Sequence, residues 1–403
     1  MKTVQVALVG IGGYGKMFLE SILERGDACH AALCGVVQPG MEKHPAAAAE
    51  LARRGVPVYR TLEDLLAERK ADLTVIASPI QYHAEQTCAA LERGSHVLCE
   101  KPACSTVQEA LRMSETSART GRFAAIGYQM SFDEGVLRLK RDILDGKLGK
   151  PRVLKALFLR ARSDRYYARN SWAGRRMDGE GRYVLDSVAH NGGSHNIHNM
   201  LYMSGNDMAV SAVPESVTAE LYRANPIENF DTAAARIVTD EGVVILFYGS
   251  HAVHGASAKR FEYQFERGRV VYDPDADKDI LAVMEDGSVL RYGDPEAQPA
   301  RKMWTCIEAV RGTGRVPCPI GAAVPEVLCI DGMQDSMPEI LEFPADSVLS
   351  WSDTGTGEKT TYVRDLDAVM RRCFENGSLP HEDRVAWSRA GRTIRLSGYR
   401  FFR

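Results

Sequence analysis

The sequence predicts an α/β protein of two domains, a doubly wound parallel sheet followed by an α+β domain with an open, mainly antiparallel sheet. Three observations lead to this fold class. A glycine-rich turn follows the first apolar strand, strands and helices alternate as far as residue 126, and strand patterns dominate after residue 150. A chain of 403 residues also has room for two domains of ~150–200 residues each.

The first strand, turn and helix organise the N-terminal domain. Residues 4–9 are apolar, as in a strand that is covered on both faces, and a helix is expected to begin near Tyr14. Between them, Gly10, Gly12 and Gly15 form the spacing G-x-G-x-x-G. The first glycine permits a tight turn, the second lets a pyrophosphate approach the backbone, and the third lets helix and strand pack closely. The stretch predicted to bind a dinucleotide is Gly10, Ile11, Gly12, Gly13, Tyr14 and Gly15.

Gln38 follows the second predicted strand, residues 32–37, at a position where an acidic residue usually binds the ribose hydroxyls. An amide can also hydrogen-bond a ribose, but it does not repel a 2′-phosphate as a carboxylate does. Lys43 or His44 can either meet such a phosphate or lie in a solvated loop. The sequence therefore predicts NAD or NADP as the cofactor and leaves the preference open.

The remaining elements of the N-terminal domain alternate in type. Strands are expected at residues 73–77, 96–99 and 123–126, and helices at residues 46–54, 82–93 and 105–120. A further helix starts at Thr61, which can act as its cap, with Asp64 completing a capping box. Gly94 is expected to end the helix before it. This alternation is typical of a parallel sheet with helices on both faces.

The pattern changes after residue 130 to a series of short strands. They are expected at residues 153–159, 217–222, 232–238, 243–248, 260–265, 270–272, 281–284 and 288–292. Residues 240–242 resemble a hairpin turn, and helices are expected at residues 303–311 and 322–340. The predicted domains are residues 1–127 and 128–340, with a C-terminal extension, residues 341–403, that packs on the second domain. Within the extension we expect a helix at 364–374 and a strand at 393–396.

Composition excludes several classes of protein. Hydrophobic residues make up 45% of the chain and charged residues 26%, as in ordinary globular enzymes. The formal net charge of -3 provides no basic field for nucleic acid or an anionic membrane. Nine cysteines, an odd number without a C-x-x-C pair, indicate reduced thiols, and neither a signal-peptide core nor a membrane-length apolar run is visible. We therefore expect a cytoplasmic protein that binds neither nucleic acid nor membrane.

Four motifs, in this order, resemble the Gfo/Idh/MocA family of NAD(P)-dependent oxidoreductases, named for glucose–fructose oxidoreductase and inositol dehydrogenase. They are the glycine turn, Ala77-Ser78-Pro79 with His83, the stretch 96–102 that ends in Glu100-Lys101-Pro102, and Ile126-Gly127-Tyr128. The resemblance implies an N-terminal Rossmann fold. It also implies cofactor contacts from Gln38, Ser78, Pro79, His83, Glu100 and Lys101.

The resemblance makes Lys101 the catalytic lysine, which reaches the nicotinamide and the substrate hydroxyl. A positive donor there stabilises the charge that develops on oxygen as hydride leaves carbon. The alternative is a surface lysine at a strand end. Catalysis is favoured, because the carboxyl ends of strands are where such sheets bind ligands.

A second group of polar residues lies between Asp186 and His198. Family members often show Asp-x-Gly-x-His-x-x-Asp here, whereas this chain has Asn191 and His198 in place of the two acids and keeps the central His195. The imidazole of His195 suits a general base, because it can exchange a proton near neutrality. Asp186 can either stabilise the imidazolium or cap a helix, and the sequence leaves both open. His190, His195 and His198 also suggest a metal site, but we expect no metal, because no acidic or cysteine ligand stands at a supportive spacing.

The aromatic and basic stretch Tyr166 to Arg176 precedes this group. Aromatic rings can stack on a sugar, and arginines can bind a carboxylate or phosphate of a substrate. The alternative is a loop that packs on its own domain or on a partner subunit. The predicted substrate-binding residues are Tyr128, Trp172, Arg175, Asp186, Asn191, His195 and His198.

The sequence thus predicts an NAD(P)-dependent oxidoreductase that acts on a sugar, cyclitol or related polyol. One alternative is an enzyme that uses tightly held NAD for transient oxidation within a hydrolysis or elimination. Another is a redox-silent sensor or regulator, which the two lost acids leave open. Because a broad open sheet presents a surface that commonly pairs, we expect a homo-oligomer, either a dimer or a tetramer.

Overall fold

The structure, a computed structural model, describes residues 2–255 and 257–403 and divides into two compact units. Unit 1 runs as far as Cys104 and adds Gln108–Asp133 and Glu296–Val324. Unit 2 comprises Ser105–Val107, Glu134–Pro295 and Pro325–Arg403. The sequence analysis assigned residues 296–324 to the second domain. They belong instead to unit 1, because helix α9 (Arg301–Val310) packs on two strands of the N-terminal sheet.

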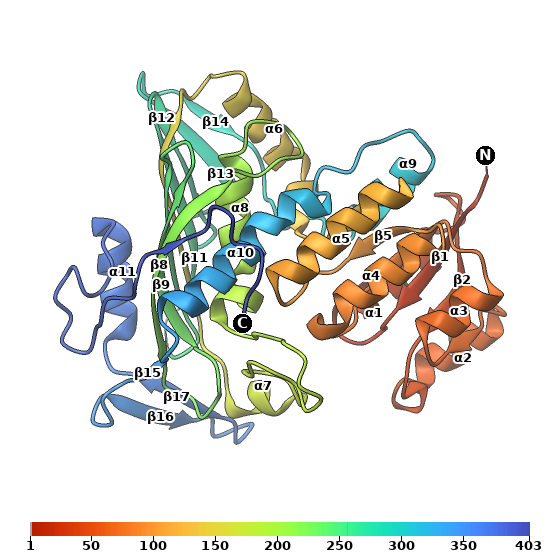
Figure 1. Cartoon of the computed structure of the whole chain (residues 1–403), viewed down its shortest axis with the longest axis horizontal. Helices are drawn as coiled ribbons and strands as arrows, with labels where there is room; N and C mark the ends of the chain where they lie inside the picture. The colour runs from red at the N-terminus through yellow and green to blue at the C-terminus, as the bar shows by residue number, and fades with distance from the viewer. Residues whose placement is uncertain (1, 256) are drawn as a thin grey trace. The chain divides into compact units, whose positions relative to one another are not determined.

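Unit 1 contains the expected parallel sheet, with six strands in the order β3-β2-β1-β4-β5-β6. The strands are β1 (Val4–Val9), β2 (Ala31–Val37), β3 (Val58–Tyr59), β4 (Leu73–Ile76), β5 (His96–Cys99) and β6 (Ala124–Ile126). The helices between them are α1 (Tyr14–Arg25), α2 (Pro45–Arg53), α3 (Leu62–Glu68), α4 (His83–Glu92) and α5 (Val107–Thr120). The predicted doubly wound fold is confirmed (Figure 1).

The strand order places the ligand-binding edge of this sheet. The chain winds outward through β2 and β3 on one side of β1, and through β4, β5 and β6 on the other. In such sheets ligands bind outside the carboxyl ends of the strands at the point where the winding reverses. That point lies between β1 and β4, which end at Val9 and Ile76.

Unit 2 is built on a ten-stranded mixed sheet, in the order β14-β13-β12-β11-β7-β10-β9-β8-β15, with β18 also paired to β8. Most neighbours are antiparallel, but β7 pairs with β10, and β15 with β8, in parallel. The strands are β7 (Pro151–Arg160), β8 (Pro214–Arg223), β9 (Thr232–Thr239), β10 (Val244–Ser250), β11 (Ser257–Phe265), β12 (Gly268–Asp273), β13 (Asp277–Met284), β14 (Val289–Arg291), β15 (Leu341–Glu342) and β18 (Ile394–Arg395). The predicted hairpin between β9 and β10 is confirmed, with Gly242 at φ +80°.

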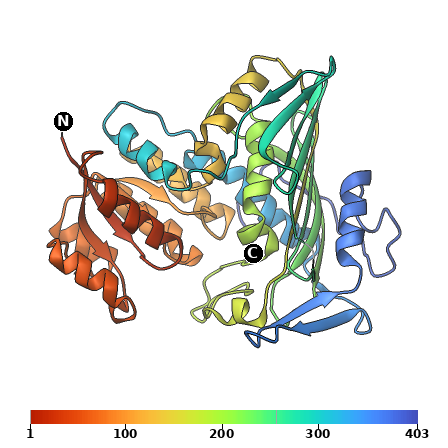
Figure 2. The same ribbon diagram turned by 180° about the vertical axis from the view of Figure 1, so that it is seen from behind.

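Helices lie on both faces of the unit 2 sheet. Helix α8 (Ser194–Met203) packs on β7 and β10 from one side, and α11 (Leu366–Asn376) packs on the same two strands from the other (Figures 1 and 2). The other helices of this unit are α6 (Glu134–Leu144), α7 (Asp164–Ala168) and α10 (Ile320–Ser336), whose first residues belong to unit 1. Helix α10 ends four residues before the predicted end at 340. No helix among the described residues is long and apolar enough to cross a membrane.

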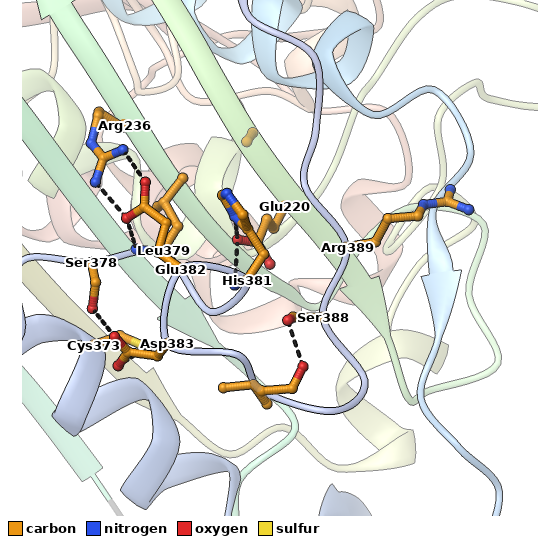
Figure 3. Close-up of polar contacts among 12 residues, drawn as sticks. Glu220, Arg236, Cys373, Ser378, Leu379, His381, Glu382, Asp383, Ser388 and Arg389 are labelled. Carbon is orange, nitrogen blue, oxygen red and sulfur yellow. Dashed lines mark hydrogen bonds and ion pairs between the residues drawn. The ribbon is translucent and has the colours of Figure 1, made fainter.

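The extension covers the outward face of the sheet, which carries charged residues on three of four neighbouring strands. Lys155, Arg236 and Glu220 all lie on this face, as the register of β7, β10, β9 and β8 shows. Arg236 makes two hydrogen bonds, of 2.5 and 2.7 Å, to the carboxylate of Glu382 in the loop after α11 (Figure 3). Glu220 is fully buried, with one oxygen 2.6 Å from Nδ1 of His381. These contacts hold the extension to the sheet.

Candidate active site

The residues predicted to form the site fall into two groups, one in each unit. The first group surrounds the glycine loop between β1 and α1. A Cβ on Gly10, which has φ +82°, would lie 2.7 Å from the carbonyl oxygen of Ala77. A Cβ on Gly15 would overlap the carbonyl of Gly10. Both positions therefore require glycine for close packing, as the spacing predicted.

The loop leaves room for a ligand where the spacing predicted one. A Cβ on Gly12 would meet only the His44 ring, at 4.0 Å, and a Cβ on Gly13 would meet nothing within 4 Å. Gly13 caps α1 without a side-chain hydrogen bond, so the first amides of the helix can serve an anion. The loop thus fits the pyrophosphate of a dinucleotide.

Gln38 braces this loop from the end of β2. Its Oε1 accepts a hydrogen bond of 2.9 Å from the backbone amide of Ile11, and its Nε2 donates to the carbonyl of Pro39. The side chain therefore carries no negative charge and already uses both ends of its amide. This arrangement fits an uncharged edge of the ribose site.

His83 joins the ends of two strands. Its ring nitrogens lie 2.9 Å from the carbonyl oxygens of Ser78, after β4, and Pro102, after β5. The ring is 1% exposed. Ser78 donates a hydrogen bond of 2.6 Å from its hydroxyl to Gln86 in α4. His83 and Ser78 thus fix the loops that the sequence analysis assigned to the cofactor.

Sequence reasoning missed Lys302, which supports the Glu-Lys-Pro segment. This lysine of α9 is 1% exposed and forms an ion pair with the buried carboxylate of Glu100. It also donates a hydrogen bond of 3.0 Å to the carbonyl of Gly127 and lies 4.6 Å from the ring of Tyr14. The partly exposed Lys101 directly follows Glu100. Lys302 therefore positions the segment that carries the predicted catalytic lysine.

Tyr128 and Tyr14 also belong to this group. Tyr128 is 1% exposed, so its predicted substrate contact needs an opening that the described surface does not provide. The Tyr14 hydroxyl donates a hydrogen bond of 2.6 Å to Gln129. Burial, and secondarily the charge of Glu100, raises the pKa of Tyr14. Tyr14 is therefore a neutral hydrogen-bonding side chain beside the glycine loop.

The second group, in unit 2, centres on a buried carboxylate. One oxygen of Asp186 accepts a hydrogen bond of 2.6 Å from the amide of Gly174, and the other accepts one of 2.8 Å from the Asn191 side chain. Burial raises the pKa of Asp186, while these hydrogen bonds oppose the shift. The cap of the following π-helical turn η4 (Val188–Gly192) is Ser187, which accepts from the amide of His190. Asp186 is therefore an anchor for Asn191 and not a helix cap.

The three histidines of this segment occupy different environments. His195 is the second residue of α8 and is partly exposed, as a general base must be. His198 is 1% exposed and stacks on Tyr202, and burial lowers its pKa to about 3. His190 is fully buried, with Nδ1 3.7 Å from Glu326. His198 is therefore a core residue. Of the three histidines, only His195 has the solvent exposure that the predicted general base needs.

The described residues contain no group of three or more His, Cys, Asp or Glu side chains that could hold a metal ion.

Trp172 and Arg175 lie on the loop after α7. Arg175 is exposed and forms a surface ion pair of 3.3 Å with Glu228. Arg169, which belongs to the predicted aromatic and basic stretch but not to the predicted substrate-binding residues, lies 5.3 Å from the Trp172 ring. Because Arg175 already has a carboxylate partner, it is a weaker candidate for binding a substrate than its neighbours.

Comparison with known sequences assigns the chain to a family. Residues 4–128 match the profile described as "Oxidoreductase family, NAD-binding Rossmann fold", and residues 136–271 match the GFO/IDH/MocA C-terminal domain. The chain belongs to the Gfo/Idh/MocA family. The resemblance that the four motifs indicated is confirmed, and the glycine loop lies within this family's NAD-binding domain.

The curated relatives include the inositol 2-dehydrogenase of Corynebacterium glutamicum (strain R). It is 29% identical over 157 residues, which cover 39% of this chain and 45% of the relative. A 1-carboxy-3-chloro-3,4-dihydroxycyclohexa-1,5-diene dehydrogenase of Comamonas testosteroni is 32% identical over 100 residues, 25% of each chain. The chain thus matches less than half the length of these curated relatives.

Solved structures share the fold of this Gfo/Idh/MocA chain. The WlbA dehydrogenase of Bordetella pertussis, in complex with NADH and UDP-GlcNAcA, superimposes with a TM-score of 0.69 at 20% identity, covering 84% of this chain and 96% of that one. GenD2 from gentamicin A biosynthesis, in complex with NAD, gives 0.67 at 19% identity, covering 84% and 95%. Both units of the fold therefore recur in these proteins.

Proposed function

We propose that the protein is an NAD(P)-dependent oxidoreductase that transfers hydride between a nicotinamide and a hydroxyl-bearing carbon of a sugar, cyclitol or related polyol. The observation that carries the proposal is the intact cofactor end of unit 1. There the glycine loop is open at Gly12, and the buried Lys302–Glu100 pair supports Lys101. Named relatives that are inositol 2-dehydrogenases support the substrate class.

The bound nicotinamide would supply the hydride acceptor or donor. Lys101 donates a hydrogen bond to the reacting oxygen and stabilises the charge that develops there. His195 exchanges the hydroxyl proton as general base or acid. Asn191, held by Asp186, can hydrogen-bond a further hydroxyl of the substrate. The residues that would hold the nucleotide are those of the glycine loop with Gln38, Ser78 and His83.

Turnover with a defined panel of substrates tests the proposal. Purified protein is incubated with NAD or NADP and with myo-inositol, D-glucose or D-glucuronate, and reduced nicotinamide is followed by its absorbance. We expect reduced cofactor to accumulate in proportion to the oxidised product. Product formation without reduced cofactor would instead indicate transient oxidation by tightly held NAD. Nucleotide binding without any conversion across the panel would favour the sensor.

Two further expectations accompany this function. Nine free cysteines, six of them buried, suit a reduced compartment, and we propose a cytoplasmic location.

We also propose a homo-oligomer. Because the extension covers the outward face over β7 to β10, copies would pair through another part of the sheet, such as the β14 edge with its exposed Val289 and Leu290. Light scattering of the purified protein measures the assembly directly.

A further inference from the structure

Unit 2 contains a cluster of three arginines, two of which lie over one tyrosine ring. Arg160 ends β7, Arg162 follows it, and Arg169 comes directly after α7. The Cζ atoms of Arg162 and Arg169 lie 4.0 Å and 3.6 Å from the centre of the Tyr166 ring. Two guanidinium groups therefore share a single aromatic side chain, an arrangement that fixes their orientation.

Two other arginines of the same segment have carboxylate partners, whereas the arginine cluster does not. Arg165 lies 3.3 Å from Glu358, and Arg175 lies 3.3 Å from Glu228. Within residues 2–255 and 257–403, no carboxylate oxygen comes within 4.0 Å of a guanidinium nitrogen of the arginine cluster. The cluster thus carries positive charge that the described chain leaves without an ion pair.

Arg162 is the most constrained member of the cluster. Its Nε is shielded from solvent and has no hydrogen-bond partner in the described chain. Burial lowers the pKa of Arg162, and the charges of Arg160 and Arg169 act in the same direction. Because an arginine side chain keeps its charge at any working pH, this charge stays in an unfavourable environment. A bound anion would relieve it.

Neighbouring titratable groups do not neutralise the cluster. Asp186 is fully buried, and both of its oxygens already accept hydrogen bonds from other groups. Asp231, the other buried carboxylate near His251, accepts its hydrogen bonds from Ala224, Asn225 and Thr232. His251 adds no negative charge, and burial lowers its pKa to about 3, so its ring is neutral. None of these groups therefore forms an ion pair with the cluster.

The arginine cluster adjoins the residues proposed to bind substrate. The His251 ring lies 5.9 Å from the Tyr166 ring, and its Nδ1 lies 2.9 Å from the carbonyl oxygen of Arg160. A Cβ on Gly192 would come within 3.1 Å of Cε1 of the same histidine. Gly192 directly follows Asn191 in η4. His251 therefore lies next to both the arginine cluster and the neighbour of Asn191, so the two groups are close together in unit 2.

We propose that the arginine cluster binds an anionic group, a carboxylate or a phosphate, of the substrate. The substrate would then be an acidic or phosphorylated sugar or polyol and not a neutral one. Guanidinium forks bind either anion through paired, charge-assisted hydrogen bonds. This inference rests on the proposed function, because it concerns the substrate of the same reaction.

Binding measurements on the full chain test the inference without turnover. Protein saturated with NAD is titrated calorimetrically with D-glucose, D-glucuronate and D-glucose 6-phosphate, which are neutral, carboxylate and phosphate probes of one ring. We expect at least one anionic probe to bind ten times or more tightly than glucose. Arg162→Gln and Arg169→Gln should each weaken that probe about tenfold or more and leave glucose unchanged. Arg165→Gln, an arginine of the same segment with a carboxylate partner, is the matched control.

The outcomes separate this inference from the proposed function. Equal or absent binding of all three probes to the wild type, or equal effects of Arg162→Gln and Arg165→Gln, would overturn the anion site. Turnover of a neutral polyol that Arg162→Gln does not change would also overturn it, while the oxidoreductase stands. Loss of anion binding in the cluster variants with no turnover of any probe would keep the anion site and reject the redox role. Arg162→Lys, which keeps the charge and loses the fork, should bind with intermediate strength, and thermal melts show that each variant is folded.

Discussion

At the scale of single residues, Lys101 is the most direct test of the redox role. Lys101→Met keeps the length and much of the apolar packing of the side chain but removes the ammonium group. A preorganised donor of this kind contributes ~3–4 kcal/mol to the transition state, so we expect single-turnover hydride transfer to fall at least a hundredfold. Lys101→Arg should also be severely impaired, because its planar fork misplaces the donor. Lys70→Met, at an exposed lysine of the same unit, is the control, and hydride transfer within tenfold of wild type in Lys101→Met would refute the catalytic role.

His195 carries the second residue-scale prediction. His195→Asn should lower turnover by ~10²–10⁴ while nucleotide binding stays nearly unchanged, because the residue handles a proton and belongs to unit 2. His198 gives the contrast, since it is 1% exposed and buried against Tyr202. His198→Asn should lower thermal stability and have the smaller effect on the turnover of folded protein. Near-normal turnover of His195→Asn would assign the base to another residue.

The third residue-scale prediction concerns Gln38 and the relative affinity for NADP and NAD. Without a carboxylate at the end of β2, NADP should bind within a hundredfold of NAD, a difference of less than about 2.7 kcal/mol. Gln38→Glu keeps an oxygen that can accept from the Ile11 amide but adds negative charge, so it should weaken NADP more than NAD. Titration of both nucleotides against wild type and variant measures this. A wild-type preference for NAD beyond a hundredfold contradicts the prediction.

At this scale, the role of a residue can be predicted from the sequence when its contacts are with residues close to it in the chain. The roles of Gly10 and Gly15 follow from six residues of sequence, and the structure shows the close packing that the spacing requires. Lys302 lies more than 200 residues from Glu100, on a helix with no distinguishing pattern. Asp186 shows the same limit. The sequence leaves open a helix cap and a group that stabilises the imidazolium, and it does not reveal the contacts with Gly174 and Asn191 that exclude the cap.

At the scale of elements, α9 is joined to the cofactor sheet by a buried ion pair, and its removal should be costly. Lys302→Met leaves the Glu100 carboxylate buried without its cation, for which we expect a loss of about 3–5 kcal/mol in the free energy of unfolding. Adding Glu100→Gln removes the stranded charge and should restore part of the loss. Urea unfolding of the two variants and the wild type measures the coupling. Equal stability of the single and double variants would show that the pair does not hold α9.

Element prediction succeeded where burial gives a clear period. Apart from the two-residue β3, which was missed, the strands and helices of unit 1 are confirmed within a few residues, because apolar strands such as β4 are buried along their whole length. The hairpin β16 (Val348–Ser352) and β17 (Lys359–Val363) and the two-residue β15 were missed. Strand β16 has no buried residue, so it lacks the hydrophobic pattern on which prediction depends.

At the scale of the whole molecule, the extension is the part that sequence reasoning could only call structural. Its position depends on charges spread over β7, β8 and β9, and none of these strands shows in its own sequence that Glu382 or His381 will face it. The hydrogen bonds that attach the extension include two from Arg236 to Glu382 and two between His381 and Glu220, one at the His381 amide and one at its Nδ1. The expected open surface of the sheet is therefore covered by the chain itself.

The attachment of the extension should depend on acidity. Hydrogen bonds from Arg236, the largest cause, lower the pKa of Glu382 to about 2 from an ordinary value near 4.3, with help from the amide of Leu379 and the charge of His381. A carboxyl group whose pKa is lower in the folded state stabilises fully above its unfolded pKa. That contribution is lost as the pH falls from about 4.3 toward 2.

Because Glu382 and Arg236 are each about one-third exposed, solvent screening limits the effect, and we expect at most ~1 kcal/mol. Glu382→Gln should flatten the fall in urea stability between pH 5 and pH 3 and speed proteolysis of the extension at neutral pH. Glu50→Gln is the matched control, since Glu50 has a similarly lowered pKa of about 2 but pairs only with Arg53 and Arg54 of its own helix region. It should leave proteolysis of the extension unchanged. If Glu382→Gln and wild type lose stability in parallel and resist protease equally, the Arg236–Glu382 pair does not fasten the extension, and other contacts, such as those of Glu220 with His381 and of α11 with β7 and β10, hold it instead.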